Sequence, residues 1–346
     1  MSNQKLFHVA VVGATGAVGE QIIRLLETRD FPIEKLTLLS SERSAGTKLT
    51  FKGNDITVKA ATPDSFKGVD IALFSAGGGV SLELIPHAIS HGAVCIDNTS
   101  AYRMDPDTPL VVPEVNIDRI NEHKGVIANP NCSTIQMVAA LKPLYDRYGI
   151  SRIIVSTYQA VSGAGSRAID EMLRQSKEIL AGNTVEPQIL PVGALPVKHQ
   201  IAFNAIPQID KFTENGFTYE EMKMINETKK ILGDDSLEVT ATCVRIPVVY
   251  GHSESVYVEM KQDFDLEEVK QLLADAPGIV LQDNPAEQQY PLAADAAGKL
   301  ETFVGRVRRD LSNPRGLNMW IVSDNLLKGA AWNAVQIAEY IAIEQK

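Results

Sequence analysis

A single cysteine lies where the sequence predicts the start of a helix. Cys132 follows the turn-forming segment 129–131, and apolar side chains recur at helical spacing from Ile135 onward. The free N–H groups and the dipole at a helix N-terminus lower the pKa of a thiol and favour the nucleophilic thiolate. We therefore predict that Cys132 is a nucleophile, with a buried, inert thiol as the alternative. Cys95 and Cys243 lie within strand-like runs and are weaker candidates.

A glycine-rich turn near the beginning of the chain is typical of a dinucleotide site. Gly13, Gly16 and Gly19 follow the apolar, strand-like run 6–12 and precede a helical pattern at 21–28. In this context the first glycine permits a tight turn, the second lets the backbone approach a pyrophosphate, and the third lets helix and strand pack closely. The helix N-terminus offers N–H donors to the phosphates. The alternative is a tight turn without a ligand.

The end of the second predicted strand bears on the choice between NAD and NADP. NAD sites usually carry an acidic residue there, which binds the ribose 2′-hydroxyl. Here the hydroxyls of Ser40 and Ser44 and the guanidinium of Arg43 can hold a 2′-phosphate. Glu42 can instead face a 2′-hydroxyl, so it is the residue that fits least well. We favour NADP, with a polar surface loop as the alternative.

A thiolate beside a nicotinamide suits covalent chemistry on a carbonyl group. Attack of the thiolate on an aldehyde gives a hemithioacetal, and loss of hydride leaves a thioester, which passes to water or phosphate. The reverse direction reduces an acyl phosphate. Either direction needs a general acid/base to handle the carbonyl proton.

The elements that would position these residues form two groups. Residues 1–130 alternate between strand and helix patterns, which predicts a parallel, doubly wound α/β sheet. A second, α+β domain is predicted from strand-like runs at 152–159 and 238–249, a helix at 168–180 and an irregular stretch at 186–209. The chain closes with an amphipathic helix that Asp324 or Asn325 can cap. We expect this helix to return to the first domain, with packing on the second as the alternative.

Composition is that of an ordinary globular protein. The chain has 346 residues, of which 45% are hydrophobic and 22% charged, and this length fits about two domains. The net charge of −10 argues against a general nucleic-acid binder. Three cysteines and six histidines, without a metal-ligand cluster, predict a reduced compartment and no metal site. No apolar run reaches the roughly 18 residues of a membrane span, so we expect a cytoplasmic protein.

In three segments the chain resembles the aspartate-semialdehyde dehydrogenases. These are, in the expected order, residues 13–19 (Gly-Ala-Thr-Gly-Ala-Val-Gly), 129–134 (Asn-Pro-Asn-Cys-Ser-Thr) and 251–254 (Gly-His-Ser-Glu). The resemblance covers the whole length and implies a Rossmann domain (1–131 and 325–346), a catalytic and dimerisation domain (132–324) and a homodimer. It also implies NADPH-dependent reduction of aspartyl phosphate to aspartate semialdehyde and phosphate, on the route to lysine, methionine and threonine.

The resemblance implies a role for several individual residues. Cys132 matches the nucleophile that forms the acyl thioester, and His252 matches the acid/base. Because His252 lies in a polar loop after a predicted strand, we expect its side chain to be exposed. Arg103 and Lys223 match a pair that binds phosphate. The ordinary alternatives are a surface histidine for His252 and a solvated helix face for Lys223.

Further residues match contacts to the substrate and the cofactor. Gln159 matches a residue that positions the substrate, and Arg245 one that holds its carboxylate, with a structural salt bridge as the alternative for Arg245. Glu220 matches an acidic partner, although the adjacent Glu221 leaves the register open. The implied cofactor contacts are Gly13, Thr15, Gly16, Ala17, Val18, Ser40, Arg43, Ser44, Ser162, Gly163 and Asn325.

Two other functions compete with this interpretation. N-acetyl-glutamyl-phosphate reductases share the chemistry and the domain plan but bind a larger, acylated substrate. A catalytically silent NADP-binding sensor would keep the glycine-rich turn and need no reactive thiol. Glyceraldehyde-phosphate dehydrogenases are less similar, because their Ser-Cys-Thr-Thr-Asn signature is absent from the sequence.

Overall fold

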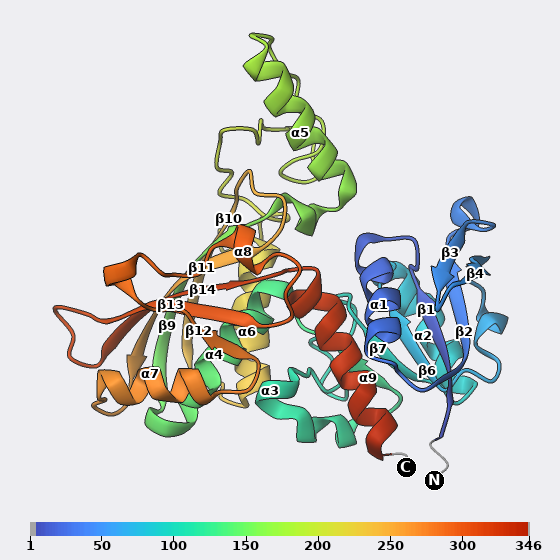
Figure 1. Ribbon diagram of the computed structural model, residues 1–346, viewed down its shortest axis with the longest axis horizontal. Helices are drawn as coiled ribbons and strands as arrows, with labels where there is room; N and C mark the ends of the chain where they lie inside the picture. Colours follow the sequence, from blue (N-terminus) through green and yellow to red (C-terminus); the bar gives the residue numbers. More distant parts are fainter. Residues whose placement is uncertain (1–4, 345–346) are drawn as a thin grey trace. The chain divides into compact units, whose positions relative to one another are not determined.

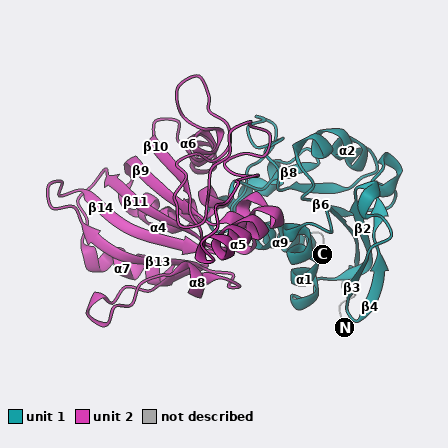
Figure 2. Ribbon diagram, turned by 90° about the horizontal axis from the view of Figure 1, so that it is seen from above, with its two compact units in different colours: residues 1–131, 330–346 teal, residues 132–329 magenta. Residues whose placement is uncertain are grey.

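The computed structural model describes residues 5–344, and the chain divides into two compact units. Unit 1 consists of Met1–Asn131 and Ala330–Lys346, and unit 2 of Cys132–Gly329 (Figures 1 and 2). Residues 325–329 therefore group with unit 2. Residues 1–4 and 345–346 of the predicted first domain lie outside the described part of the chain.

Unit 1 is built on a six-stranded sheet whose neighbouring strands all run parallel. In spatial order the strands are β5 (Lys59–Ala60), β2 (Ile33–Ser40), β1 (Phe7–Val12), β6 (Ile71–Phe74), β7 (Val94–Asp97) and β8 (Val126–Ala128). The order reverses between β1 and β6, which makes the sheet doubly wound. A separate hairpin consists of β3 (Lys48–Phe51) and β4 (Asn54–Thr57). The predicted parallel sheet is confirmed.

The described part of unit 1 contains the helices α1 (Ala17–Thr28), α2 (Gly78–Ser90), α3 (Pro113–Asn116) and α9 (Trp332–Glu344), with short 3-10 turns between strands. Helices α1, α2 and α9 pack against the sheet, whereas α3 packs on α9. α1 buries Ile22, Leu25 and Leu26, and the buried side chains of β1 and β6 complete the core. A strand covered on both faces is apolar at nearly every position, and β1 is apolar at five of its six positions.

Helix α9 belongs to unit 1 although its residues come last in the chain. It packs on α1 and β7. Asn333 Nδ2 donates to Val111 O at 3.0 Å and to Asn129 Oδ1 at 2.7 Å, and Arg29 pairs with Glu339 at 2.9 Å. The prediction that the final helix returns to the first domain is thus confirmed.

Unit 2 contains a six-stranded mixed sheet. Its order is β10 (Glu238–Arg245), β9 (Ile150–Gln159), β11 (His252–Met260), β14 (Gly316–Ser323), β13 (Thr302–Arg309) and β12 (Ile279–Leu281). β9 and β10 run parallel, whereas β11 runs antiparallel to β9 and β14. The predicted strand at 238–249 ends earlier, at Arg245, because Pro247 has no N–H to donate to a neighbouring strand.

In unit 2 the helices α4 (Cys132–Tyr148), α6 (Tyr219–Leu232) and α7 (Leu266–Asp275) cover one face of this sheet. The helix α5 (Ser166–Leu180) packs on the turn Val161–Ala164, and the short helix α8 (Ala293–Ala296) contacts β14. α4 packs on β9, β11, β13 and β14 and on helices α6 and α7. Alternate residues of β9 are buried from Ile153 to Gln159, so the strand has one covered and one partly exposed face. The segment 186–209 contains neither helix nor strand, as predicted.

No helix in residues 5–344 is both long enough and apolar enough to cross a membrane.

Candidate active site

Three strands of unit 2 place polar side chains on the helix-covered face at one edge of the sheet. Gln159 ends β9 and Arg245 ends β10, and the two residues are paired directly. β11 runs the other way and begins with His252, and its next residue pairs with Tyr158. The register therefore puts Gln159, Arg245 and His252 side by side on one face, although they are far apart in sequence.

Cys132 is the first residue of α4 and is partly exposed. One turn further along this helix, Gln136 Nε2 donates to His252 O at 3.4 Å, and Gln136 Oε1 accepts from Ser323 Oγ at 2.7 Å. These bonds hold the first turns of α4 against the start of β11. The position at a helix N-terminus agrees with the sequence prediction for Cys132.

The other two cysteines have different surroundings. Cys95 on β7 and Cys243 on β10 are both fully buried. Burial raises the pKa of both thiols well above the usual range. A buried neutral thiol is a poor nucleophile, so Cys132 is the candidate that the structure favours.

The expectation of an exposed His252 is wrong. The residue begins β11 and is 0% exposed, because its side chain points to the face that α4 covers. Burial, followed by the positive charge of Arg245, lowers the pKa of His252 to about 3. The Ala160 N–H donates to His252 Nδ1 at 3.1 Å. A neutral imidazole has one N–H, so the proton of this ring lies on Nε2.

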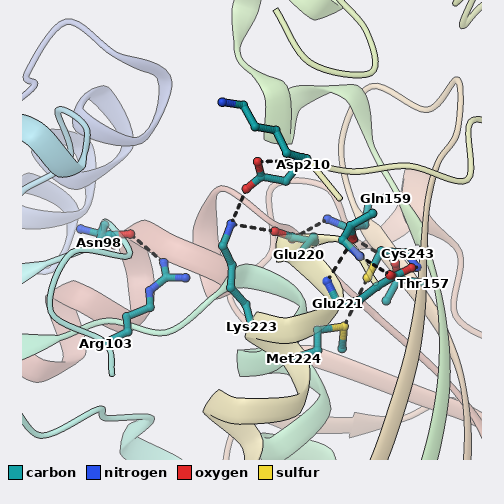
Figure 3. Close-up of polar contacts among 12 residues, drawn as sticks. Asn98, Arg103, Thr157, Gln159, Asp210, Glu220, Glu221, Lys223, Met224 and Cys243 are labelled. Atoms are coloured by element: carbon teal, nitrogen blue, oxygen red, sulfur yellow. Dashed lines mark hydrogen bonds and ion pairs between the residues drawn. The ribbon is translucent and has the colours of Figure 1, made fainter. Parts of the chain in front are cut away.

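A chain of polar contacts runs from Gln159 to α6 (Figure 3). Gln159 Nε2 donates to Glu220 Oε1 at 3.2 Å and lies 3.3 Å from His252 Nε2. Glu220 Oε2 pairs with Lys223 Nζ at 3.2 Å, and Lys223 Nζ also pairs with Asp210 Oδ2 at 3.1 Å. Glu220 and Lys223 are three residues apart on one helix, so both side chains lie on the face of α6 toward the strand edge.

The structure separates the two adjacent glutamates of α6. Glu221 forms a capping box with Thr218, the residue before the helix, and its Oε1 accepts from Cys243 N at 3.0 Å. Glu221 therefore stabilises the start of α6, whereas Glu220 contacts Gln159. Of the two glutamates, Glu220 is the one that lies beside Gln159, and its role as the acidic partner stays a prediction.

Arg245 is buried at the same end of the strands, and one N–H group of its guanidinium has no hydrogen-bond partner among the described residues. Its Nη1 donates to Ala160 O at 2.7 Å, whereas its Nε is buried without a hydrogen-bond partner among the described residues. Gly163 lies beside it: a Cβ there would be 3.0 Å from Arg245 Nη1 and 3.3 Å from His252 Nε2. A glycine at this position keeps the space next to both groups open.

The loop that carries Gly163 is tied to the residues around His252. Ser162 Oγ and the Asn325 side chain are within hydrogen-bond distance, at 3.0 and 3.1 Å, and the Gly251 N–H donates to Asn325 Oδ1 at 3.0 Å. Asn325 does not cap the final helix, since α9 begins only at Trp332. Asp324 Oδ1 instead accepts from two backbone N–H groups of the preceding turn.

Arg103 belongs to unit 1 and is buried there. Its Nε donates to Asn129 O at 2.9 Å, and its Nη2 donates to Asn98 O at 2.8 Å, the second of which Figure 3 shows. Both carbonyls follow strand ends, β8 for Asn129 and β7 for Asn98. Arg103 is therefore anchored at the carboxyl edge of the parallel sheet, where ligands of such folds bind.

The predicted dinucleotide turn opens onto a pocket of about 580 Å³ in unit 1. Its lining includes Gly13, Thr15, Gly16, Ser40, Ser41, Glu42, Arg43 and Ser44. Thr15 Oγ1 lies 2.9 Å from Ser40 Oγ, which joins the turn to the end of β2. Ala17 and Val18 begin α1 directly after this turn.

Two glycines of the turn are required by its geometry. Gly13 has φ of +87°, and a Cβ there would be 2.5 Å from Ser75 O. A Cβ on Gly19 would be 2.1 Å from Gly13 O, so this residue lets α1 approach β1 as a dinucleotide fold requires.

Sequence reasoning did not identify four residues of this region. Asp210, Gln136 and Gly329 have no local signal, because each reaches the site only through the fold. Glu254 could have been found from the sequence, because it lies two residues beyond His252 and a strand places such residues on the same face. Among the described residues, no group of three or more His, Cys, Asp or Glu side chains can hold a metal ion.

Comparison with protein families gives two matches that together span most of the chain. Residues 8–123 match the semialdehyde dehydrogenase NAD-binding domain, and residues 141–328 match the semialdehyde dehydrogenase dimerisation domain. The family plan thus pairs a nucleotide-binding domain with a domain that forms dimers.

Individual relatives are similar over nearly the whole length. An aspartate-semialdehyde dehydrogenase of Bacillus subtilis is 62% identical over 333 residues, which is 96% of each chain. The crystal structure of aspartate semialdehyde dehydrogenase II of Vibrio cholerae complexed with ASA has a TM-score of 0.91 at 50% identity, and covers 97% of this chain and 98% of that one. The Candida albicans enzyme with NADP has a TM-score of 0.74 at 26% identity, with 97% and 98% covered.

Proposed function

We propose that this chain, which belongs to the aspartate-semialdehyde dehydrogenase family, reduces L-aspartyl 4-phosphate to L-aspartate 4-semialdehyde and phosphate with NADPH. The reaction serves lysine, methionine and threonine biosynthesis. One observation carries the proposal. Gln159, Arg245 and His252 meet at one sheet edge, and the helix that begins with Cys132 is bonded to the backbone of His252.

Cys132 is the proposed nucleophile. Its thiolate attacks the acyl carbon, the bond from that carbon to the phosphate oxygen breaks, and phosphate leaves with the electron pair. NADPH supplies the hydride that reduces the resulting thioester. As the acid/base residue, neutral His252 donates its Nε2 proton in a hydrogen bond to the carbonyl oxygen, which stabilises the negative charge that the hydride creates there, and the aldehyde leaves as the thiolate reforms. The proton position on Nε2, with Nδ1 occupied by the Ala160 N–H, supports this assignment.

The proposed substrate contacts come from the neighbouring strand ends and from α6. Arg245 binds the substrate carboxylate, and its unpaired buried Nε supports a ligand that completes its bonding. Gln159 orients the reacting group next to His252, and Glu220 holds Gln159 in place. We assign Lys223 and Arg103 to the phosphate, as cations suited to an anion.

The proposed dinucleotide is NADP, bound in the pocket of unit 1. Gly13, Thr15, Gly16, Ala17 and Val18 face the pyrophosphate through backbone groups. The side chains of Ser40, Arg43 and Ser44 hold the 2′-phosphate at the end of β2, and Ser162, Gly163 and Asn325 contact the nicotinamide end. Replacing Arg43 by alanine should raise KM for NADP at least tenfold and change that for NAD little.

We also propose a homodimer formed by unit 2. The support is the match to a dimerisation domain and a partly exposed sheet face that carries the ring pair Tyr158 and Trp320, 5.4 Å apart. Aromatic side chains of this kind are enriched at protein interfaces. Tyr158→Arg should shift the sedimentation coefficient from that of a dimer to that of a monomer.

A cytoplasmic location stays a prediction from the sequence.

The deciding experiment is phosphate-dependent reduction of NADP⁺. We expect turnover with aspartate semialdehyde and little with N-acetylglutamate semialdehyde, and the opposite preference would refute the substrate assignment. Cys132→Ala should abolish turnover while it leaves NADP binding within about twofold. Full activity in that variant would refute covalent catalysis, and inactivity of the unmodified enzyme with both aldehydes would favour a sensor.

A further inference from the structure

We propose that Asp210 tunes the affinity of the active site for phosphate by competing with it for Lys223. The inference rests on the proposed role of Lys223 as a phosphate ligand. Asp210 lies outside the three segments that resemble the family. It would act through Lys223 and is therefore a positioning residue, not a group that reacts with substrate.

The ammonium group of Lys223 is paired with two carboxylates. Asp210 Oδ2 lies 3.1 Å from Lys223 Nζ, and Glu220 Oε2 lies 3.2 Å from the same nitrogen (Figure 3). The Glu220 side chain is 7% exposed and is held by Gln159, whereas the Asp210 side chain is 36% exposed. Glu220 is thus a fixed partner of the ammonium group, and Asp210 is the partner that borders solvent.

Backbone hydrogen bonds hold the segment that carries Asp210. Ile206 and Arg245 exchange two backbone hydrogen bonds of 2.9 Å, and the Tyr219 N–H donates to Lys211 O at 2.9 Å. These contacts fix the chain on both sides of Asp210, whose φ is +68°. Non-glycine residues seldom adopt this conformation, and it persists only where surrounding contacts enforce it. The carboxylate is therefore held opposite Lys223 by the same segment that pairs with the substrate-binding Arg245.

The Asp210 carboxylate would repel a phosphate bound to Lys223. Two oxygen atoms that each bind one ammonium nitrogen at about 3 Å are at most about 6 Å apart. A phosphate on Lys223 would lie that close to the Asp210 carboxylate, and both groups are negative. Repulsion over this distance in salt water corresponds to about three- to tenfold weaker binding of a dianion. The carboxylate would thus favour release of the phosphate product and keep Lys223 paired while the site is empty.

The test is Asp210→Asn, assayed as aspartate semialdehyde oxidation with inorganic phosphate varied. Asparagine tolerates the positive φ and can still accept the Lys211 N–H at its Oδ1, as Asp210 does at 2.8 Å. We expect KM for phosphate to fall about three- to tenfold, while KM for the semialdehyde changes less than twofold. If Asp210→Asn does not fold, Asp210→Gly, which also suits this backbone, must give the same fall.

Asp30→Asn is the matched control. Asp30 also has a positive φ, of 49°, and pairs with a lysine, Lys52, at 2.6 Å, but that lysine is not a candidate phosphate ligand. This variant should leave every KM unchanged. An effect of Asp30→Asn equal to that of Asp210→Asn would overturn the proposal, because a change in net charge would then explain both.

A double variant separates the role of Asp210 from that of Lys223. In a Lys223→Met background, Asp210→Asn should change KM for phosphate less than twofold, because methionine offers no ammonium group for which Asp210 and phosphate could compete. If Lys223→Met alone leaves KM for phosphate unchanged, the phosphate assignment of Lys223 fails and the inference fails with it. If Lys223→Met raises KM but Asp210→Asn does not lower it, the inference alone is wrong.

Discussion

At the scale of single residues, position in the fold separates side chains of the same type. Cys132 is partly exposed at a helix N-terminus, whereas Cys95 and Cys243 are buried in strands, and burial raises the pKa of both. A thiol reacts as the thiolate, and only an accessible one meets a reagent. The three cysteines should therefore differ sharply in reactivity.

We expect iodoacetamide to modify Cys132 first and to stop at one label per chain under native conditions. Peptide mass spectrometry identifies the site, and the remaining activity should fall in proportion to the label. Substrate should slow the reaction because it occupies the same thiol. Rapid labelling of Cys243 or Cys95 in the folded protein would contradict this account.

Glu254 is a second case in which the fold changes the behaviour of one side chain. It follows His252 by two residues on β11, is fully buried, and both of its carboxyl oxygens lack hydrogen-bond partners among the described residues. Burial raises the pKa of Glu254 well above its usual range. The folded protein therefore holds this carboxyl in its neutral form at pH values where an unfolded chain ionises it.

The consequence is a pH-dependent effect of Glu254→Gln. A raised pKa in the folded state stabilises the protein below about pH 4.5, and this contribution is lost as pH rises toward the folded-state pKa. The variant should gain free energy of unfolding relative to the unmodified protein as pH rises, by up to about 1.4 kcal/mol per pH unit. Urea unfolding from pH 5 to pH 9 measures it. Glu259→Gln, on the partly exposed face of β11, is the control and should show a smaller trend.

At the scale of elements, the site depends on how helices and turns meet the sheet edge. A π-helical turn, Leu327–Ala331, precedes α9. A Cβ on its Gly329 would be 2.7 Å from Cys132 Cβ and 3.2 Å from Cys132 Cα. Real Cβ atoms do not approach so closely, so a side chain at Gly329 would displace the proposed nucleophile.

Gly329→Ala should therefore lower kcat at least tenfold and slow alkylation of Cys132. Overpacking of a filled site also costs about 1–3 kcal/mol of stability, which thermal unfolding measures. Gly193→Ala is the matched control, because a Cβ there has nothing within 4 Å. Equal effects of the two substitutions on kcat would show that contact with Cys132 is not the cause.

At the scale of the whole molecule, the two ends of the chain build one unit. Asn333 on α9 is fully buried, and its Nδ2 donates to Val111 O and Asn129 Oδ1. Asn129 lies in the segment that leads into Cys132. The last helix thus supports, through one amide, the turn at which the chain leaves the first unit.

Asn333→Asp should destabilise unit 1 by about 3 kcal/mol or more. The aspartate oxygen would replace Nδ2 of Asn333, which donates to both Val111 O and Asn129 Oδ1. These two oxygens would then face either a buried negative charge or a carboxyl group that cannot pair with both. Chemical unfolding provides the measurement. Asn204→Asp is the control, since that exposed Nδ2 donates to Gln200 O at 3.0 Å and water can replace the bond. A loss below 1 kcal/mol for Asn333→Asp would show that this amide contributes little to the attachment of α9.

Local sequence patterns were sufficient to predict several parts of this protein. The run 6–12, the three glycines and the helix after them predicted a parallel nucleotide-binding sheet, because hydrophobic period and turn chemistry act over a few residues. The same reasoning placed Cys132 at a helix N-terminus. The Asn-Pro-Asn-Cys-Ser-Thr and Gly-His-Ser-Glu segments indicated the family, which the comparisons confirm.

Only the tertiary structure decided what depends on contacts between distant segments. It buried His252, because the antiparallel register of β11 turns that side chain toward α4. It separated Glu220 from Glu221, since one caps α6 and the other contacts Gln159. It set Asp210 against Lys223 through a segment with no regular structure. Such pairings follow from strand register and packing across long sequence separations, which no local pattern encodes.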